Sequence, residues 1–103
     1  MIDRRYQVVR TGTPLENSEP EAALLATAGA DLIAGPPTDS AEADLIAALR
    51  DADIVINSGN RLTKGVIDGL SRCQAIIQQS VGFDVIDVAA ATERGILVAN
   101  LFD

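Results

Sequence analysis

The chain has 103 residues, 48% apolar and 22% charged, the composition of one small globular domain. A net charge of −7 argues against nucleic-acid binding and against an anionic membrane surface. A single cysteine and no histidine exclude an internal disulfide, a Ser-His-Asp triad and a Cys/His zinc site. Because the N-terminus has no apolar run of signal-peptide or membrane-span length, we expect a cytoplasmic protein.

Short apolar runs alternate with helical patterns along the chain. The runs predict five strands: Tyr6–Val9, Asp31–Ala34, Asp53–Ile56, Gln74–Gln78 and Ile96–Ala99. Side chains of N-cap type begin the four predicted helices between them: Ser18, Asp39 or Ser40, Thr63 and Asp87. Gly29 and Gly95 are expected to end the first and last of these helices, and Gly35-Pro36-Pro37 to end the second strand.

This alternation predicts an α/β fold with parallel strands, because strands joined by helices cross over in the same direction. We expect a flavodoxin-like three-layer sandwich with a five-stranded parallel sheet, forming a single domain over residues 1–103. The apolar strand runs are continuous, as in a sheet buried on both faces. The final helix that would cover one face is missing after the fifth strand. We therefore expect either a homodimer through the uncovered sheet face or a truncated fragment of a longer protein.

Two loops of small residues follow predicted strands, Asn57-Ser58-Gly59-Asn60 and Ser80-Val81-Gly82. Ligands of open parallel sheets bind beyond the carboxyl ends of the strands. Small residues let backbone N–H groups approach a ligand closely, and several such groups together bind a carboxylate. Ordinary strand-to-helix turns would have the same composition, so the residues alone leave both interpretations open.

The stretch from Val81 to Asn100 resembles the D-2-hydroxyacid dehydrogenase family, which includes phosphoglycerate, D-lactate, glyoxylate and formate dehydrogenases. The resemblance rests on a glycine and two aspartates followed by an Ala-Ala-x-x-x-Gly-Ile stretch and a Val-x-Asn ending. These residues are Gly82, Asp84, Asp87, Ala90, Ala91, Gly95, Ile96, Val98 and Asn100. We interpret the two aspartates as structural.

The resemblance implies an N-terminal substrate-binding domain that holds a small 2-hydroxy or 2-oxo acid against NAD or NADP. It implies substrate-binding residues in both loops: Ser58, Gly59, Asn60, Ser80, Val81 and Gly82. Asn57 stands where several members have arginine, and Asn100 where the chain would cross to a cofactor domain, so both are possible cleft or hinge residues. No catalytic, cofactor-binding or metal residue is expected in this chain, because the Gly-x-Gly-x-x-Gly fingerprint and the catalytic histidine are absent. We therefore expect an oxidoreductase segment that is inactive alone.

Three other classes of protein compete with this interpretation of the sequence. A standalone self-associating domain is compatible with the same fold. A flavin carrier is disfavoured, because Thr11-Gly12-Thr13 is a weak phosphate-loop match with acids crowding the next helix start. A phospho-receiver is rejected, since Arg10, Asn57 and Asn100 stand where it needs acids and a lysine. Cys73 is interpreted as a packing residue and not as a nucleophile.

Overall fold

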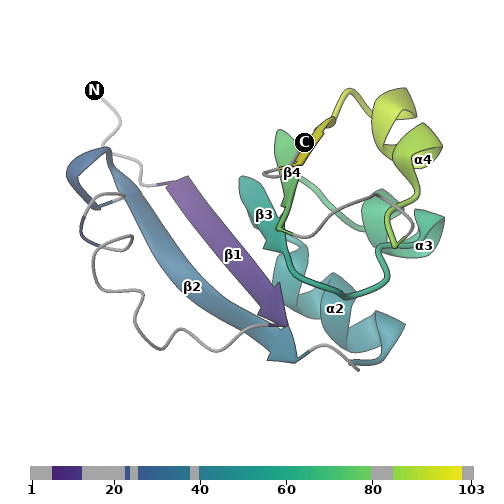
Figure 1. Ribbon diagram of the computed structural model, residues 1–103, viewed down its shortest axis with the longest axis horizontal. Helices are drawn as coiled ribbons and strands as arrows, with labels where there is room; N and C mark the ends of the chain where they lie inside the picture. Colours follow the sequence, from purple (N-terminus) through teal and green to yellow (C-terminus); the bar gives the residue numbers. More distant parts are fainter. Residues whose placement is uncertain (1–5, 13–22, 24–25, 38–39, 80–84, 101–103) are drawn as a thin grey trace.

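Five strands form one all-parallel sheet in the order β2-β1-β3-β4-β5, which confirms the predicted α/β class (Figure 1). The computed structural model describes residues 6–12, 23, 26–37, 40–79 and 85–100. The strands are β1 (Tyr6–Gly12), β2 (Ala30–Pro37), β3 (Ile54–Asn57), β4 (Ala75–Gln78) and β5 (Leu97–Asn100). The helices with defined bounds are α2 (Glu42–Leu49), α3 (Lys64–Asp68) and α4 (Val88–Glu93). Among the described helices, none is long and apolar enough to cross a membrane.

Two of the predicted helix starts are confirmed by their hydrogen bonds. The Thr63 hydroxyl accepts the Val66 N–H at 3.3 Å and begins α3. The Asp87 carboxylate accepts the Ala90 N–H at 3.0 Å and begins α4. Each side chain satisfies a backbone donor that the first helical turn leaves without an intrahelical partner. At Gly95, which follows α4, φ is +73°, as expected for a glycine that ends a helix.

The predicted cap of α2 is wrong for Ser40. Its hydroxyl donates to the Pro37 carbonyl at 2.6 Å instead, and Ala41 takes the N-cap position with no side-chain hydrogen bond. Ser40 and Pro37 are only three residues apart, which favours this local turn over a helix cap. The other predicted cap, Asp39, lies outside the described residues, as does Ser18 at the first helix start.

Strand β2 is longer and more exposed than the sequence predicts. It continues through Gly35-Pro36-Pro37, where we expected it to end. Proline is tolerated there because β2 lies at the sheet edge, where a missing N–H removes no ladder bond on the open side. The edge position also leaves Ile33 38% exposed, so this apolar run is not buried on both faces. Strand β1 likewise extends to Gly12, with a shift in register after Arg10.

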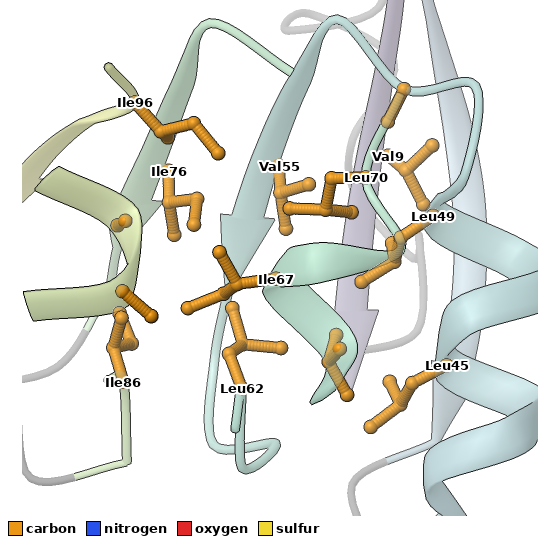
Figure 2. Packing of buried hydrophobic residues seen from close by; sticks show 14 residues of the cluster. Val9, Leu45, Leu49, Val55, Leu62, Ile67, Leu70, Ile76, Ile86 and Ile96 are labelled. Carbon is orange, nitrogen blue, oxygen red and sulfur yellow. The ribbon is translucent and has the colours of Figure 1, made fainter. Parts of the chain in front are cut away.

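The main core lies between the sheet and helices α2, α3 and α4 (Figure 2). Alternate residues of the central strands, Val55 and Ile76, are fully buried in this cluster. They pack with apolar residues of the helices and the adjoining loops: Leu45, Leu49, Leu62, Val66, Ile67, Leu70, Ile86, Ala90, Ala91 and Ile96. This packing fixes α2, α3 and α4 against one face of the sheet and so positions the loops that precede them.

The opposite sheet face is unevenly covered. Val8, Ile54, Ala75 and Leu97 stand side by side in register on four strands, one position away from the residues of the main core. Side chains alternate between the faces of a strand, so these four point away from that core. Val8 is buried, Ile54 and Ala75 are half-buried, and Leu97 is 66% exposed.

Candidate functional site

Polar side chains end the neighbouring strands at the carboxyl edge of the sheet. Asn57 of β3 pairs in register with Gln78 of β4, which pairs with Asn100 of β5. On the other side of Asn57, the Thr11 hydroxyl of β1 donates to Asn57 Oδ1 at 2.7 Å. Thr11, Asn57 and Gln78 are at most 1% exposed, and Asn100 is half-buried. These four residues form a polar row across the edge where ligands of parallel sheets bind.

Asn57 is the centre of this row. Besides accepting from Thr11, its Nδ2 donates to Gln78 Oε1 at 2.9 Å and to the Asn60 carbonyl at 3.0 Å. The side chain is therefore saturated inside the protein, as a buried amide must be. The sequence presented Asn57 as a possible cleft residue where several relatives have arginine. In the structure it links three strands to the loop that follows β3.

The loop after β3 carries three of the predicted site residues. Gly59 and Ser58 are half-buried, and the Ser58 hydroxyl donates to Gln79 Oε1 at 2.9 Å. Asn60 is fully buried, and its Nδ2 donates to the Pro37 carbonyl at 2.8 Å. Asn60 thereby ties the loop to the end of β2, while Ser58 and Gly59 remain partly open to solvent.

The second predicted loop, Ser80-Val81-Gly82, lies outside the described residues, but both chain segments that lead into it are anchored to the first loop. Before it, the Gln79 N–H donates to the Asn57 carbonyl at 2.9 Å. After it, the Leu62 N–H donates to the Val85 carbonyl at 2.7 Å, and Asp87 N–H donates to the Leu62 carbonyl at 2.9 Å. These bonds belong to an isolated parallel bridge between Leu62 and Ile86. The described residues on either side of the second loop are therefore hydrogen-bonded to Asn57 and Leu62, which flank the first loop.

A cavity of about 520 Å³ lies between the loop after β3, the start of α2 and the segment after β4. Its lining residues are Ser40, Glu42, Leu45, Gly59, Arg61, Thr63 and Val85. A second cavity of about 440 Å³ shares Arg61, Thr63 and Val85 with it. We call the first cavity the Arg61 hollow. Gly59 is the predicted site residue that faces this hollow.

The charges around the hollow differ in how they are neutralised. Lys64 forms an exposed ion pair with Asp68 at 3.0 Å, and the hydrogen bond to Asp68 raises the pKa of Lys64. Within the described part of the chain, the exposed guanidinium of Arg61 donates no hydrogen bond and forms no ion pair. No group of three or more His, Cys, Asp or Glu side chains among the described residues could hold a metal.

Cys73 lies just before the amino end of β4, at the opposite end of the strand from the candidate site. The half-buried thiol donates to the Ala75 carbonyl at 3.2 Å. Burial raises the pKa of the Cys73 thiol, so the neutral form is favoured near pH 7. A neutral, partly packed thiol fits the packing role that the sequence indicated.

The residues present do not fit a dinucleotide. A dinucleotide site places an acidic residue at the end of the second strand to bind ribose, after a Gly-x-Gly-x-x-Gly turn. Here β2 ends in Gly35-Pro36-Pro37, the sequence lacks that glycine pattern, and Thr11 at the end of β1 is buried against Asn57. No hydride-transfer step is therefore assigned to residues of this chain.

Reasoning from the sequence missed Thr11, Gln78 and Arg61. The signal for Gln78 was present, because Asn57 and Gln78 each end an apolar four-residue strand and parallel strands align at that edge. Thr11 was placed in a loop after a strand ending at Val9, so its contact with Asn57 had no local signal. Arg61 gave no signal in the sequence, because exposed arginines are common in loops.

Comparison with known proteins places this geometry in a family. The family model for the D-isomer specific 2-hydroxyacid dehydrogenase catalytic domain matches residues 14–103. D-3-phosphoglycerate dehydrogenase of Methanocaldococcus jannaschii is 43% identical over 61 residues, which are 58% of this chain and 12% of that protein. Glyoxylate reductase of Thermococcus kodakarensis is 37% identical over 60 residues, 57% of this chain and 18% of that protein.

Solved structures agree on the fold. NAD⁺-bound 3-phosphoglycerate dehydrogenase of Entamoeba histolytica superimposes with a TM-score of 0.81 at 22% identity, over 93% of this chain and 32% of that one. The TT0316 protein of Thermus thermophilus superimposes with a TM-score of 0.75 at 28% identity, over 89% and 29%. The chain thus spans about an eighth of the first curated relative and about a third of these structures. With the family match over residues 14–103, the chain belongs to the D-isomer specific 2-hydroxyacid dehydrogenase family, within its catalytic domain.

Proposed function

We propose that this chain is the substrate-binding part of an NAD- or NADP-dependent D-2-hydroxyacid dehydrogenase and acts in the cytoplasm. It holds a small 2-hydroxy or 2-oxo acid at the carboxyl edge of the sheet. The nicotinamide, bound outside these 103 residues, accepts or gives the hydride. Alone, the chain positions the acid and catalyses no turnover, because it has no histidine and no dinucleotide cradle.

One observation carries this proposal: the residues on either side of the second loop, Gln79 and Ile86, are tied to Ser58 and Leu62 by the Ser58–Gln79 hydrogen bond and the Leu62–Ile86 bridge. A carboxylate needs several backbone N–H groups in one place, and two adjacent loops of small residues supply them. In the proposed site, Ser58 and Gly59 contribute from one side, and Ser80, Val81 and Gly82 contribute from the other.

The buried side chains of Asn57 and Asn60 are proposed to position the first loop. Asn60 and Asn57 position the first loop and do not touch the acid, since both side chains are fully buried and hydrogen-bonded. Asn100, at the far end of the polar row, is the proposed hinge residue toward the cofactor-binding part. A site built this way is held rigid by the sheet, which is what positioning of a small substrate requires.

The test is a titration of the ¹⁵N-labelled chain, followed by amide chemical shifts. Pyruvate and D-lactate are the probes, and propionate is the control because it has the carboxylate without the oxygen at carbon 2. We expect saturable shifts at Ser58, Gly59 and residues 80–82 with both probes, and weaker binding of propionate. Ser58→Ala should weaken binding, whereas Ser71→Ala, at an exposed serine of the opposite sheet edge, should not. Equal shifts with propionate, or shifts away from both loops, would contradict the proposal.

A second candidate function is self-association through the sheet face opposite α2, α3 and α4. The 66% exposure of Leu97 on the edge strand favours it, together with the half-buried Ile54 and Ile77 on the same sheet face. Sedimentation velocity over a range of concentrations should then show a homodimer that Leu97→Lys converts to a monomer. Val88→Lys, at a residue 39% exposed on α4, is the matched control. A monomer at the highest concentration would refute self-association.

A further inference from the structure

Arg61 differs in its surroundings from three other described cations, Lys64, Arg72 and Arg94. Lys64 pairs with Asp68, and Arg72 lies 3.3 Å from Asp53. The Arg94 guanidinium donates to two backbone carbonyls, at 3.1 and 2.7 Å. In contrast, the Arg61 guanidinium donates no hydrogen bond to the described residues and forms no ion pair with them, and it lines both cavities at the carboxyl edge. A guanidinium left without an anion beside a cavity is a ready site for an acidic group of a ligand.

The position of Arg61 connects it to the proposed substrate site. It stands two residues after Gly59, and both residues line the Arg61 hollow. The cavity therefore connects the proposed carboxylate site at Gly59 with the side chain of Arg61. The volume of about 520 Å³ falls in the range of ligand pockets, roughly 300–1,000 Å³, and leaves room beyond a three-carbon acid.

One acidic residue that lines the hollow, Glu42, weakens the attraction of Arg61 for an anion. Glu42, in the first turn of α2, lines the same cavity. Its carboxylate lies against Gly65 of α3, in the space that a side chain at that position would fill. The negative charge of Glu42 repels a second anion and so offsets part of the attraction from Arg61.

We propose that Arg61 is a specificity-determining residue, which selects 2-hydroxy or 2-oxo acids that carry a second acidic group over those with one carboxylate. The distal carboxylate or phosphate binds the planar guanidinium, whose paired N–H donors match two oxygens of either group. This inference rests on the proposed function, because it assigns the far end of the same substrate.

The test compares matched acids by amide titration of the labelled chain. D-malate is paired with D-lactate, and D-3-phosphoglycerate with D-glycerate, so that a carboxylate and a phosphate are each tested against an uncharged group. We expect the doubly acidic member of at least one pair to bind roughly fivefold more tightly, the effect of a partly exposed charge contact. The Arg61 Nε–H resonance should shift with that member alone, and the preferred pair identifies the acidic group.

Three variants separate the charge effect from a change in fold. Arg61→Gln should lower the affinity for the doubly acidic member to that of its singly acidic partner, and Glu42→Gln should increase the preference. Arg50→Gln removes the same charge at the C-cap of α2, about 12 Å along the helix from Glu42, and should have no effect. Amide spectra of the free variants check that each is folded.

The possible results distinguish this inference from the proposed function. Equal binding of both members of each pair, or a preference that survives in Arg61→Gln, would overturn the role of Arg61 and leave the proposed substrate site intact. Absence of saturable binding by all four acids would overturn both.

Discussion

Replacing Asn57 with leucine tests whether the polar row holds the carboxyl edge together. Leucine keeps most of the buried volume but removes three hydrogen bonds, at 2.7, 2.9 and 3.0 Å. The Thr11 hydroxyl, Gln78 Oε1 and the Asn60 carbonyl then lose a partner inside the protein. Each buried polar group left this way costs about 1–3 kcal/mol, although the hydroxyl can rotate and leucine gains burial energy. We therefore expect the free energy of unfolding to fall by about 2–4 kcal/mol.

Urea denaturation followed by circular dichroism measures this loss as a shift in midpoint at constant slope. Because a domain of this size has about 5–15 kcal/mol of stability, the variant should remain measurable. Ser58→Ala, which removes one half-buried hydrogen bond, is the control and should cost less than about 1 kcal/mol. Combining Asn57→Leu with Gln78→Leu should cost less than the sum of the single variants, because the double variant leaves fewer orphaned groups. A loss below about 0.5 kcal/mol for Asn57→Leu would refute the argument.

Three further predictions concern a buried carboxylate, a helix cap and the cysteine. Asp53 is 2% exposed and accepts the Gln7 N–H at 2.8 Å, so Asp53→Ala should lower the free energy of unfolding in urea by about 1–3 kcal/mol. Arg72→Ala, which removes only its half-exposed ion-pair partner, should cost less. Asp87→Ala should cost about 1 kcal/mol by loss of the α4 cap, and Asp87→Asn nearly nothing; equal losses would contradict a capping role. The pKa of Cys73 is raised in the folded state, so its contribution is complete below the unfolded value, roughly pH 8.5, and is lost as pH rises through the folded pKa. Urea unfolding at pH 7 and pH 10 should show a smaller loss of stability in Cys73→Ala than in the parent chain.

Local chemistry allowed much of this structure to be predicted from the sequence. The order of the five strands and of the three helices with defined bounds, the caps at Thr63 and Asp87 and the helix-ending Gly95 were predicted correctly. Each depends on residues within a few positions along the chain: an apolar run bounded by turn residues, or an acceptor three positions before a backbone donor. The same pattern identified the carboxyl-edge loops as the place to look for a site.

Long-range contacts decided what the local pattern could not. Strand β2 lies at the edge of the sheet, so it accommodates two prolines and exposes Ile33, a consequence of strand order and not of its own residues. Thr11 meets Asn57 across 46 positions, and Asn57 meets Gln78 across 21. Sequence alone therefore determined the order of the strands and of the described helices, but not where β1 and β2 end. Only the tertiary structure decided which polar ends are buried together and which cation, Arg61, is left facing a cavity, because both depend on which strands become neighbours.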